Sequence, residues 1–289
     1  SERSLRRSFK DRQSGQNRMK IKIGFEIAFE APQPTPMVIL LNVHPSRQSD
    51  LLTSDQIATS PLVPIRPYHD SFGNECGRLF LPPGRTMLSY SGIVRDTGQP
   101  DPVTPSAQQI AVQDLPDQCI LYLLPSRYCE TDRLMQLAWS LFKDTPLGWS
   151  RVQAICDYVH NHLTFGYQFA APTKSAHDVH DERRGVCRDF AHLAVTLCRC
   201  MNIPARYCTG YLGDIGVPPE ETPMDYSAWF EVYLSGTWYT FDARHNVPRI
   251  GRILVGRGRD AADVPLSTSF GQTTLTHFKV YTDELREAQ

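Results

Sequence analysis

Hydrophobic and charged residues alternate along the first patterned segment of the chain, residues 20–30. Its apolar positions are Ile21, Ile23, Phe25, Ile27 and Phe29. Successive side chains of a strand point to opposite faces, so this pattern predicts a half-buried β-strand. Further short apolar runs follow at residues 37–43, 77–81, 86–94 and 120–124, separated by turns rich in Pro, Gly and Asp. We therefore predict a β-sandwich-like domain over residues 19–128.

The hydrophobic period changes to that of a helix after Tyr128. Thr131-Asp132 and Ser150 are predicted to cap two helices, because apolar residues recur at helical spacing after each. A third helical pattern runs from Cys187 to about Met201 and ends before Pro204, which cannot continue a helix. Residues 129–289 are thus predicted to form a second domain that contains helices.

Two strands are predicted downstream, at residues 227–234 and 237–242, joined by Ser235-Gly236. A two-residue turn would pair Leu234 with Thr237. Ser227 and Asp242 would then be diagonal neighbours on one face of the hairpin, close enough to interact.

Cys187 is the strongest candidate for a chemical role. It lies at the predicted start of a helix, where the helix dipole and unpaired N–H groups favour a thiolate. Gly185 leaves room beside the thiol, and Arg183, Arg184 and Arg188 supply positive charge. The alternative is that Cys187 is a small buried hydrophobic residue, as free cysteine usually is.

These segments resemble a bacterial member of the transglutaminase-like superfamily. The resemblance rests on residues 185–193, on 203–207 with Gly210-Tyr211, on 228–231 and on Phe241-Asp242. It implies an α+β papain-like core with the cysteine helix packed on an antiparallel sheet, preceded by an N-terminal β-domain. It also implies Cys187 as the nucleophile, Asp242 as the residue that orients a base, and acyl transfer from an amide through a thioester.

The chain departs from the family pattern at one position. The family histidine before the Ala-Trp pair is replaced by Ser227, which cannot relay a proton near neutral pH. His245 is the nearest replacement: in a continued strand it would face away from Cys187, whereas a turn at Ala243-Arg244 would bring it back. His192 is expected to be a partner of Asp189 or partly exposed.

Other residues near Cys187 have weaker claims to a role. His177 and His180 are expected in a solvated loop. Tyr167 or Gln168 could help the Cys187 backbone N–H to hold an oxyanion, although an ordinary surface position is the simpler interpretation. The segment 249–263, rich in Arg and Gly, is expected to be a solvated loop without a nucleotide site. The alternative is a basic rim that orients an acidic substrate.

Composition limits the other possibilities. The net charge of −1 over 289 residues gives no general attraction to nucleic acid or to an anionic membrane. No segment has the length and hydrophobicity of a membrane span, and we expect a cytoplasmic protein. The eight cysteines contain no C-x-x-C pair, so we expect no metal site, and no cofactor is implied. Residues 1–18 are expected to be a basic, flexible tail.

The sequence therefore predicts cysteine-dependent amide chemistry on a protein or peptide substrate. Hydrolysis is favoured over acyl transfer to an amine. The alternative is a catalytically impaired domain that binds peptides in the same cleft, and Ser227 is the residue that supports it.

Overall fold

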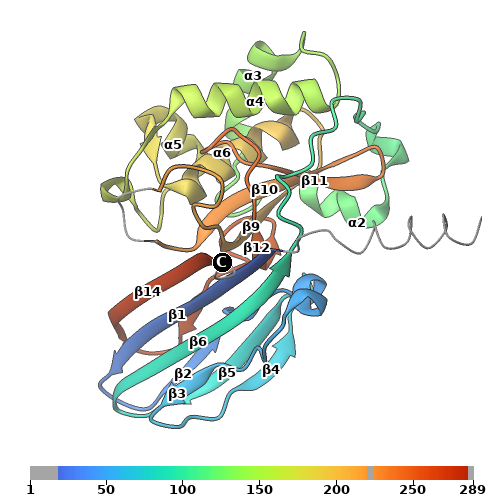
Figure 1. Ribbon diagram of the computed structural model, residues 1–289. Coiled ribbons are helices and arrows are strands. Elements are labelled where there is room, and N and C mark those ends of the chain that lie inside the picture. Colours follow the sequence, from blue (N-terminus) through green and yellow to red (C-terminus); the bar gives the residue numbers. More distant parts are fainter. Residues whose placement is uncertain (1–18, 220–223, 286–289) are drawn as a thin grey trace, which may run out of the picture.

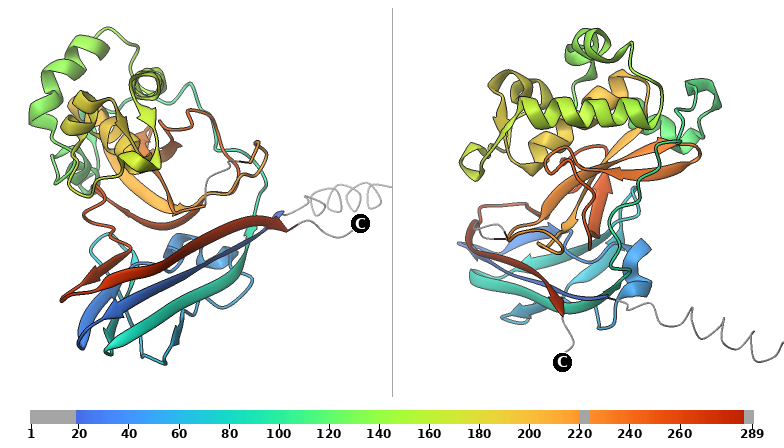
Figure 2. Two further views of the ribbon diagram at one scale, coloured as in Figure 1. Left: turned by 90° about the vertical axis from the view of Figure 1, so that its left-hand side faces the viewer. Right: turned by 45° about the horizontal axis from the view of Figure 1, so that its top comes forward.

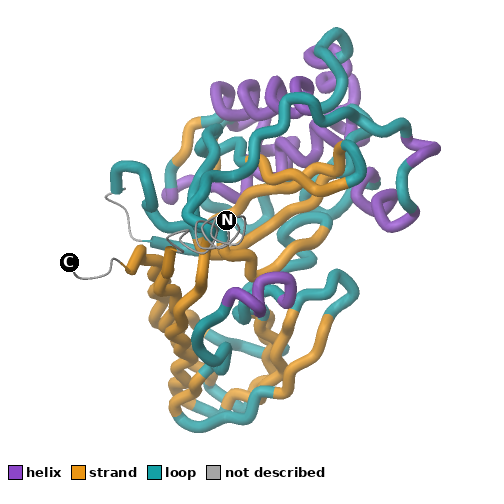
Figure 3. The backbone as a smooth tube through the Cα atoms, turned by 45° about the vertical axis from the view of Figure 1, so that its right-hand side comes forward, coloured by secondary structure: helices purple, strands orange, loops and turns teal. Residues whose placement is uncertain are grey.

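The computed structural model describes residues 19–219 and 224–285, so the expected tail 1–18 lies outside the described residues. Two halves are visible: a β-sandwich, and a mixed half in which helices cover a sheet (Figure 1). In the side views the helices gather at the end of the molecule remote from the sandwich (Figure 2), and the backbone tube shows strands dominating the other end (Figure 3).

The sandwich consists of two four-stranded antiparallel sheets. The first has the order β14 (Thr274–Leu285), β1 (Met19–Ala31), β6 (Gly84–Asp96), β3 (Ala58–Ser60). The second has the order β13 (Ser267–Ser269), β2 (Thr35–Ile39), β5 (Glu75–Leu81), β4 (Arg66–His69). The alternating residues of β1, such as Ile21, Ile23 and Phe25, share one buried cluster with Met37 and Leu81 of the opposite sheet. The predicted strand pattern is thus confirmed where it is strongest.

A third antiparallel sheet carries the candidate chemistry. Its order is β11 (Thr237–Phe241), β10 (Ser227–Leu234), β9 (Ala205–Tyr211), β12 (Ile253–Gly258). Helix α6 (Cys187–Cys200) packs on β10 and β9, and it is covered by α3 (Thr131–Phe142), α4 (Trp149–His162) and α5 (Ala176–Glu182). A short parallel pair, β7 (Thr164–Phe165) and β8 (Arg184–Gly185), precedes α6.

The fold class expected from the sequence, α+β with a papain-like core and an N-terminal β-region, agrees with this architecture. The β10–β11 hairpin has the predicted register, with Leu234 opposite Thr237. Ser235 and Gly236 both have positive φ values, 46° and 85°, as a tight two-residue turn requires.

The connection between the halves differs from the sequence prediction. The apolar run 120–124 was expected to be a strand, but α2 (Asp117–Ile120) continues directly into the 3₁₀ helix η3 (Leu121–Leu123). Two further short 3₁₀ helices are η1 (Pro45–Asp50) and η2 (Val112–Asp114). A short apolar run does not by itself separate helix from strand, and here η3 packs against α6 and β9.

The end of the described chain returns to the sandwich. β14 pairs along β1 with Val280 opposite Phe25, and β13 pairs with β2. Figure 1 shows β14 beside β1 at the edge of the sandwich. The division of the chain at residue 128 remains a prediction, but this pairing shows that residues 267–285 complete the β-sandwich. Of the described helices, none is long and apolar enough to cross a membrane.

Candidate active site

Cys187 is the first residue of α6, as the sequence predicts, and its side chain is half-buried. The Asp189 carboxylate accepts a hydrogen bond from the Val186 N–H at 2.9 Å and so fixes the start of the helix. A Cβ at Gly185 would lie 2.6 Å from Asp189 Oδ2, which explains why a glycine precedes the helix. Local sequence therefore places the thiol.

The thiol opens into a narrow cleft with a volume of about 90 Å³. The backbone N–H of Ala228 in β10 lowers the pKa of the Cys187 thiol, but by less than burial raises it. The other residues that line the cleft are Tyr167, Leu212, Asp214, Met224, Asp225, Tyr226, Ser227, Arg244, His245 and Arg249. The cleft thus brings His245 and Ser227 together with Cys187.

A tight turn after β11 brings His245 into this cleft. Asp242 Oδ1 accepts hydrogen bonds from the backbone N–H groups of Arg244 and His245, at 3.0 and 3.1 Å. The Asn246 N–H donates to the Asp242 carbonyl at 2.8 Å, and the imidazole Nδ1 of His245 lies 2.8 Å from Asp242 Oδ2. Of the two alternatives for His245, the turn is therefore the one observed, and the extended strand is not.

Arg252 supports the Asp242 carboxylate at Oδ2, the same oxygen that His245 contacts. Its Nη2 donates to Asp242 Oδ2 at 2.9 Å, and its Nε donates to Asp101 Oδ2 at 2.8 Å. Burial opposes ionisation of Asp242, but the Arg252 charge and the His245 hydrogen bonds hold its pKa well below the usual range. Asp242 is accordingly a carboxylate that can orient the imidazole through Nδ1.

The sequence did not reveal Arg252, because residues 249–263 were expected to form a solvated loop. That prediction is wrong for the middle of the segment, because residues 253–258 form β12 at the edge of the third sheet. Arg252, directly before this strand, is 8% exposed. The available signal was the apolar run Ile253-Leu254-Val255, which follows Arg252 directly and forms the first half of β12.

The environment of Cys187 does not acidify the thiol in the expected way. Burial raises its pKa to about 11, and the guanidinium of Arg244 opposes this rise. Arg188 is directed elsewhere, with its guanidinium 5.6 Å from the centre of the Tyr128 ring. The helix N-terminus and the three predicted arginines therefore do not outweigh desolvation, and a thiolate requires a nearby proton acceptor.

Ser227 is buried in the cleft, and its Oγ has no hydrogen-bond partner among the described residues. Tyr167 lines the same cleft from the 3₁₀ helix η4 (Tyr167–Phe169), whereas Gln168 is not among the lining residues. Serine and tyrosine hydroxyls are thus the neutral polar groups of the cleft.

The remaining histidines lie away from the thiol. His192 is fully buried between the rings of Tyr128 and Tyr207, so the expectation of a partly exposed side chain or an Asp189 partner is wrong. His177 and His180 belong to α5 and not to a loop, and the His180 Nε2 lies 3.0 Å from the Tyr158 hydroxyl. Among the described histidines, His245 is the one that lines the Cys187 cleft.

Comparisons with known proteins agree with this fold. The sequence profile of the transglutaminase-like superfamily matches residues 136–243. A solved structure described as a "putative cysteine protease" from Cytophaga hutchinsonii matches with a TM-score of 0.79 and 32% identity, over 94% of this chain and 93% of that chain.

Two mycobacterial relatives match over shorter segments. An uncharacterized protein of Mycobacterium leprae (strain TN) is 36% identical over 109 residues, which are 36% of this chain and 39% of the relative. One from Mycobacterium tuberculosis (strain ATCC 25618 / H37Rv) is 36% identical over 92 residues, or 29% of each chain. The match thus spans less than half the length of these curated relatives.

Proposed function

Because the chain belongs to the transglutaminase-like superfamily, we propose that it is a cysteine-dependent enzyme that hydrolyses peptide amide bonds through a thioester. The observation that carries this proposal is the turn after β11, which brings His245, already bonded to Asp242, into the cleft of Cys187. Cys187 is the nucleophile, His245 the base and Asp242 the residue that orients the base.

The reaction begins with proton transfer from the Cys187 thiol to the His245 Nε2, since Nδ1 is held by Asp242. The sulfur then attacks the substrate carbonyl carbon, and the carbonyl oxygen takes the negative charge. When the C–N bond breaks, His245 gives its proton to the leaving amine and a thioester remains. His245 then takes a proton from water as the water oxygen attacks the thioester carbonyl carbon. The C–S bond breaks, His245 returns the proton to the Cys187 sulfur, and the carboxylic acid product is released.

The raised pKa of the thiol supports the need for this base. A thiol with a pKa of about 11 is almost fully protonated at neutral pH, so an unassisted Cys187 would be a poor nucleophile. We assign the oxyanion to the backbone N–H of Cys187, at the start of α6, and to the Tyr167 hydroxyl across the cleft.

Water is proposed as the acyl acceptor in preference to an amine. The neighbouring structure from Cytophaga hutchinsonii is described as a putative cysteine protease, and the cleft at Cys187 is small, about 90 Å³. Mass spectrometry of a peptide library incubated with the protein and a primary amine tests this point. Hydrolysed peptides are expected, whereas amine adducts as the main products would contradict hydrolysis.

The role of His245 is tested by the rate at which iodoacetamide alkylates Cys187 as a function of pH. All seven other cysteines are buried, so labelling reports on Cys187, and a Cys187→Ser variant provides the background. We expect His245→Ala to slow alkylation at pH 7 by about 100-fold, the typical contribution of a positioned base. We also expect the apparent pKa of the thiol to rise in this variant.

The alternative function is peptide binding by a catalytically impaired cleft, and the unpartnered Ser227 hydroxyl is the observation that favours it. The variant Ser227→His restores a histidine at the family position and separates the two proposals. If alkylation is slow in the wild type, unchanged in His245→Ala and accelerated only in Ser227→His, the enzyme proposal is wrong and the binding proposal is preferred.

A further inference from the structure

A second, larger cavity of about 310 Å³ lies on the face of the third sheet that is turned away from α6. Along β10, Phe230 and Val232 pack into the cluster that contains α6, whereas the alternate residues Trp229 and Glu231 line this cavity. Its other wall comes from η1 and from the linker after β6, including Arg47 and Pro100. The cavity is therefore formed by both halves of the molecule, and Arg249 lines both this cavity and the Cys187 cleft.

A β-bulge in β12 aims a second arginine into this cavity. Leu254 pairs with Gly210 and Arg257 with Cys208, two residues apart on β9, although they are three apart on β12. The extra residue on β12 places Leu254 and Arg257 on the same face, where regular alternation would put them on opposite faces. Arg257 thus joins Arg252 in the lining of the cavity.

The acidic residues of the cavity are already engaged by other groups. Glu231 Oε2 is bonded to the Arg206 guanidinium at 2.6 Å, and Asp96 is paired with Arg47 at 3.3 Å. Asp101 Oδ2 accepts from Arg252 Nε at 2.8 Å and from a backbone N–H at 2.9 Å. None of these carboxylates forms a hydrogen bond with Arg257.

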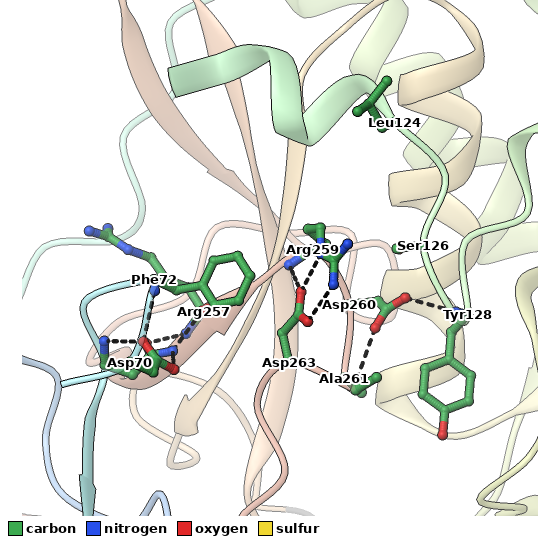
Figure 4. Close-up of polar contacts among 12 residues, drawn as sticks. Asp70, Phe72, Leu124, Ser126, Tyr128, Arg257, Arg259, Asp260, Ala261 and Asp263 are labelled. Carbon is green, nitrogen blue, oxygen red and sulfur yellow. Dashed lines mark hydrogen bonds and ion pairs between the residues drawn. The ribbon is translucent and has the colours of Figure 1, made fainter. Parts of the chain in front are cut away.

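Two guanidinium groups retain unused donors. Arg252 is 8% exposed, and its Nη1 is buried without a hydrogen-bond partner among the described residues. The backbone N–H of Arg257 donates to Asn74 Oδ1, and Asn74 Nδ2 donates to the Arg257 carbonyl, both at 2.9 Å. The Arg257 guanidinium group, however, has no hydrogen bond within the described part of the chain. By contrast, the neighbouring Arg259 is paired with Asp263, as Figure 4 shows.

A buried guanidinium donor without an acceptor costs folding free energy, because it has lost its hydrogen bonds to water. The guanidinium group also fits the oxygens of a planar carboxylate or a tetrahedral phosphate, to which it can donate two hydrogen bonds at once. We propose that this cavity is a binding site for a small oxyanion, a carboxylate or a phosphate, held by Arg252 and Arg257. The anion supplies the acceptors that the chain does not. Arg252 also donates a hydrogen bond to Asp242, so its side chain connects the proposed anion site to the proposed catalytic carboxylate.

Isothermal titration calorimetry of the full chain tests this proposal. Sodium phosphate and sodium succinate are titrated separately at a constant ionic strength set with NaCl, so that the two oxyanion classes are distinguished. The Cys187→Ser background is used, because the binding measurement then does not depend on the proposed catalysis. We expect saturable binding of at least one anion, weakened about tenfold or more by Arg257→Gln.

Arg66→Gln is the matched control, because Arg66 is exposed on β4 and does not line the cavity. The Arg66→Gln variant should bind each anion with the same affinity as the Cys187→Ser parent. Arg257→Lys keeps the charge but not the guanidinium group, and we expect it to bind the anion with intermediate affinity. If Arg257→Gln does not fold, Arg257→Lys replaces it as the test variant. The proposal is overturned if neither anion binds saturably, or if the Arg257 variants bind as tightly as Arg66→Gln.

Discussion

Burial determines the chemistry of His192. The ring is fully buried, stacked 5.0 Å from the Tyr128 ring and 5.1 Å from the Tyr207 ring. Its Nε2 accepts a hydrogen bond from the backbone N–H of Ala261 at 3.0 Å, which requires an unprotonated nitrogen. Burial, reinforced by the positive charge of Arg188, lowers the pKa of this imidazole well below its usual value. His192 is therefore a neutral structural residue.

This burial predicts a loss of stability in acid. Below about pH 6.5 the unfolded imidazole binds a proton that the folded one does not. The free energy of unfolding should therefore fall, by at most about 1.4 kcal/mol per pH unit from this residue. The variant His192→Gln, whose amide oxygen can still accept from Ala261, should show a smaller slope in urea unfolding at pH 7.5, 6.5 and 5.5. An unchanged slope would contradict the assignment.

At the scale of elements, the turn after β11 is held against α4. Asn246 has a positive φ of 54°, and its Nδ2 donates to Asp157 of α4 at 2.8 Å. Its Oδ1 accepts from Gln153 of the same helix at 2.9 Å. The left-handed residue closes the turn, and the side-chain bonds fix it in place, so α4 indirectly positions His245.

Two variants of Asn246 separate the backbone requirement from the side-chain contacts. Asn246→Gly keeps the positive φ at little cost but removes both bonds to α4. Asn246→Ala removes the bonds and also places a β-carbon in the left-handed region, which costs about 1 kcal/mol more. We expect Asn246→Ala to be the less stable in urea unfolding and the slower to be alkylated at Cys187. Equal behaviour of the two variants would show that the turn does not depend on this conformation.

At the scale of the whole molecule, one hydrophobic cluster connects the two halves. It contains Phe25 and Val280 of the sandwich together with Tyr211, Ala228 and Ile253 of the third sheet. Cys187 packs against the same cluster. The sandwich is thus part of the support for the cleft, and the two halves are expected to unfold together.

The four tryptophans report on this coupling, since Trp139, Trp149, Trp229 and Trp238 all lie in the mixed half. Val280→Ala removes a side chain that is 4% exposed in the sandwich, and we expect a loss of about 2 kcal/mol. Leu275→Ala on the same strand, where the residue is 53% exposed, should change stability by less than about 0.5 kcal/mol. The fluorescence midpoint in urea should fall only for Val280→Ala. A separate, unshifted tryptophan transition would contradict coupled unfolding.

The sequence by itself determined the features that depend on neighbouring residues. The alternation of β1, the start of α6 at Cys187 and the register of the β10–β11 hairpin follow from side-chain period, helix-end chemistry and turn length. Each of these is decided within a few residues, so the pattern was sufficient. The candidate Cys187 could be named for the same reason, whereas the role of Asp242 is what the family resemblance implies.

Only the tertiary structure decided which groups meet. The proximity of His245 to Cys187 depends on a turn that is closed by Asp242 and tied to α4. The role of Arg252 depends on Asp101, which is 151 positions earlier in the chain, and β14 pairs with a strand at the opposite end of the described chain. The pKa of Cys187 is likewise raised by burial, which depends on how segments distant in the sequence pack around the thiol. Such long-range contacts and desolvation leave no periodic pattern in the sequence, and for that reason they had to be read from the structure.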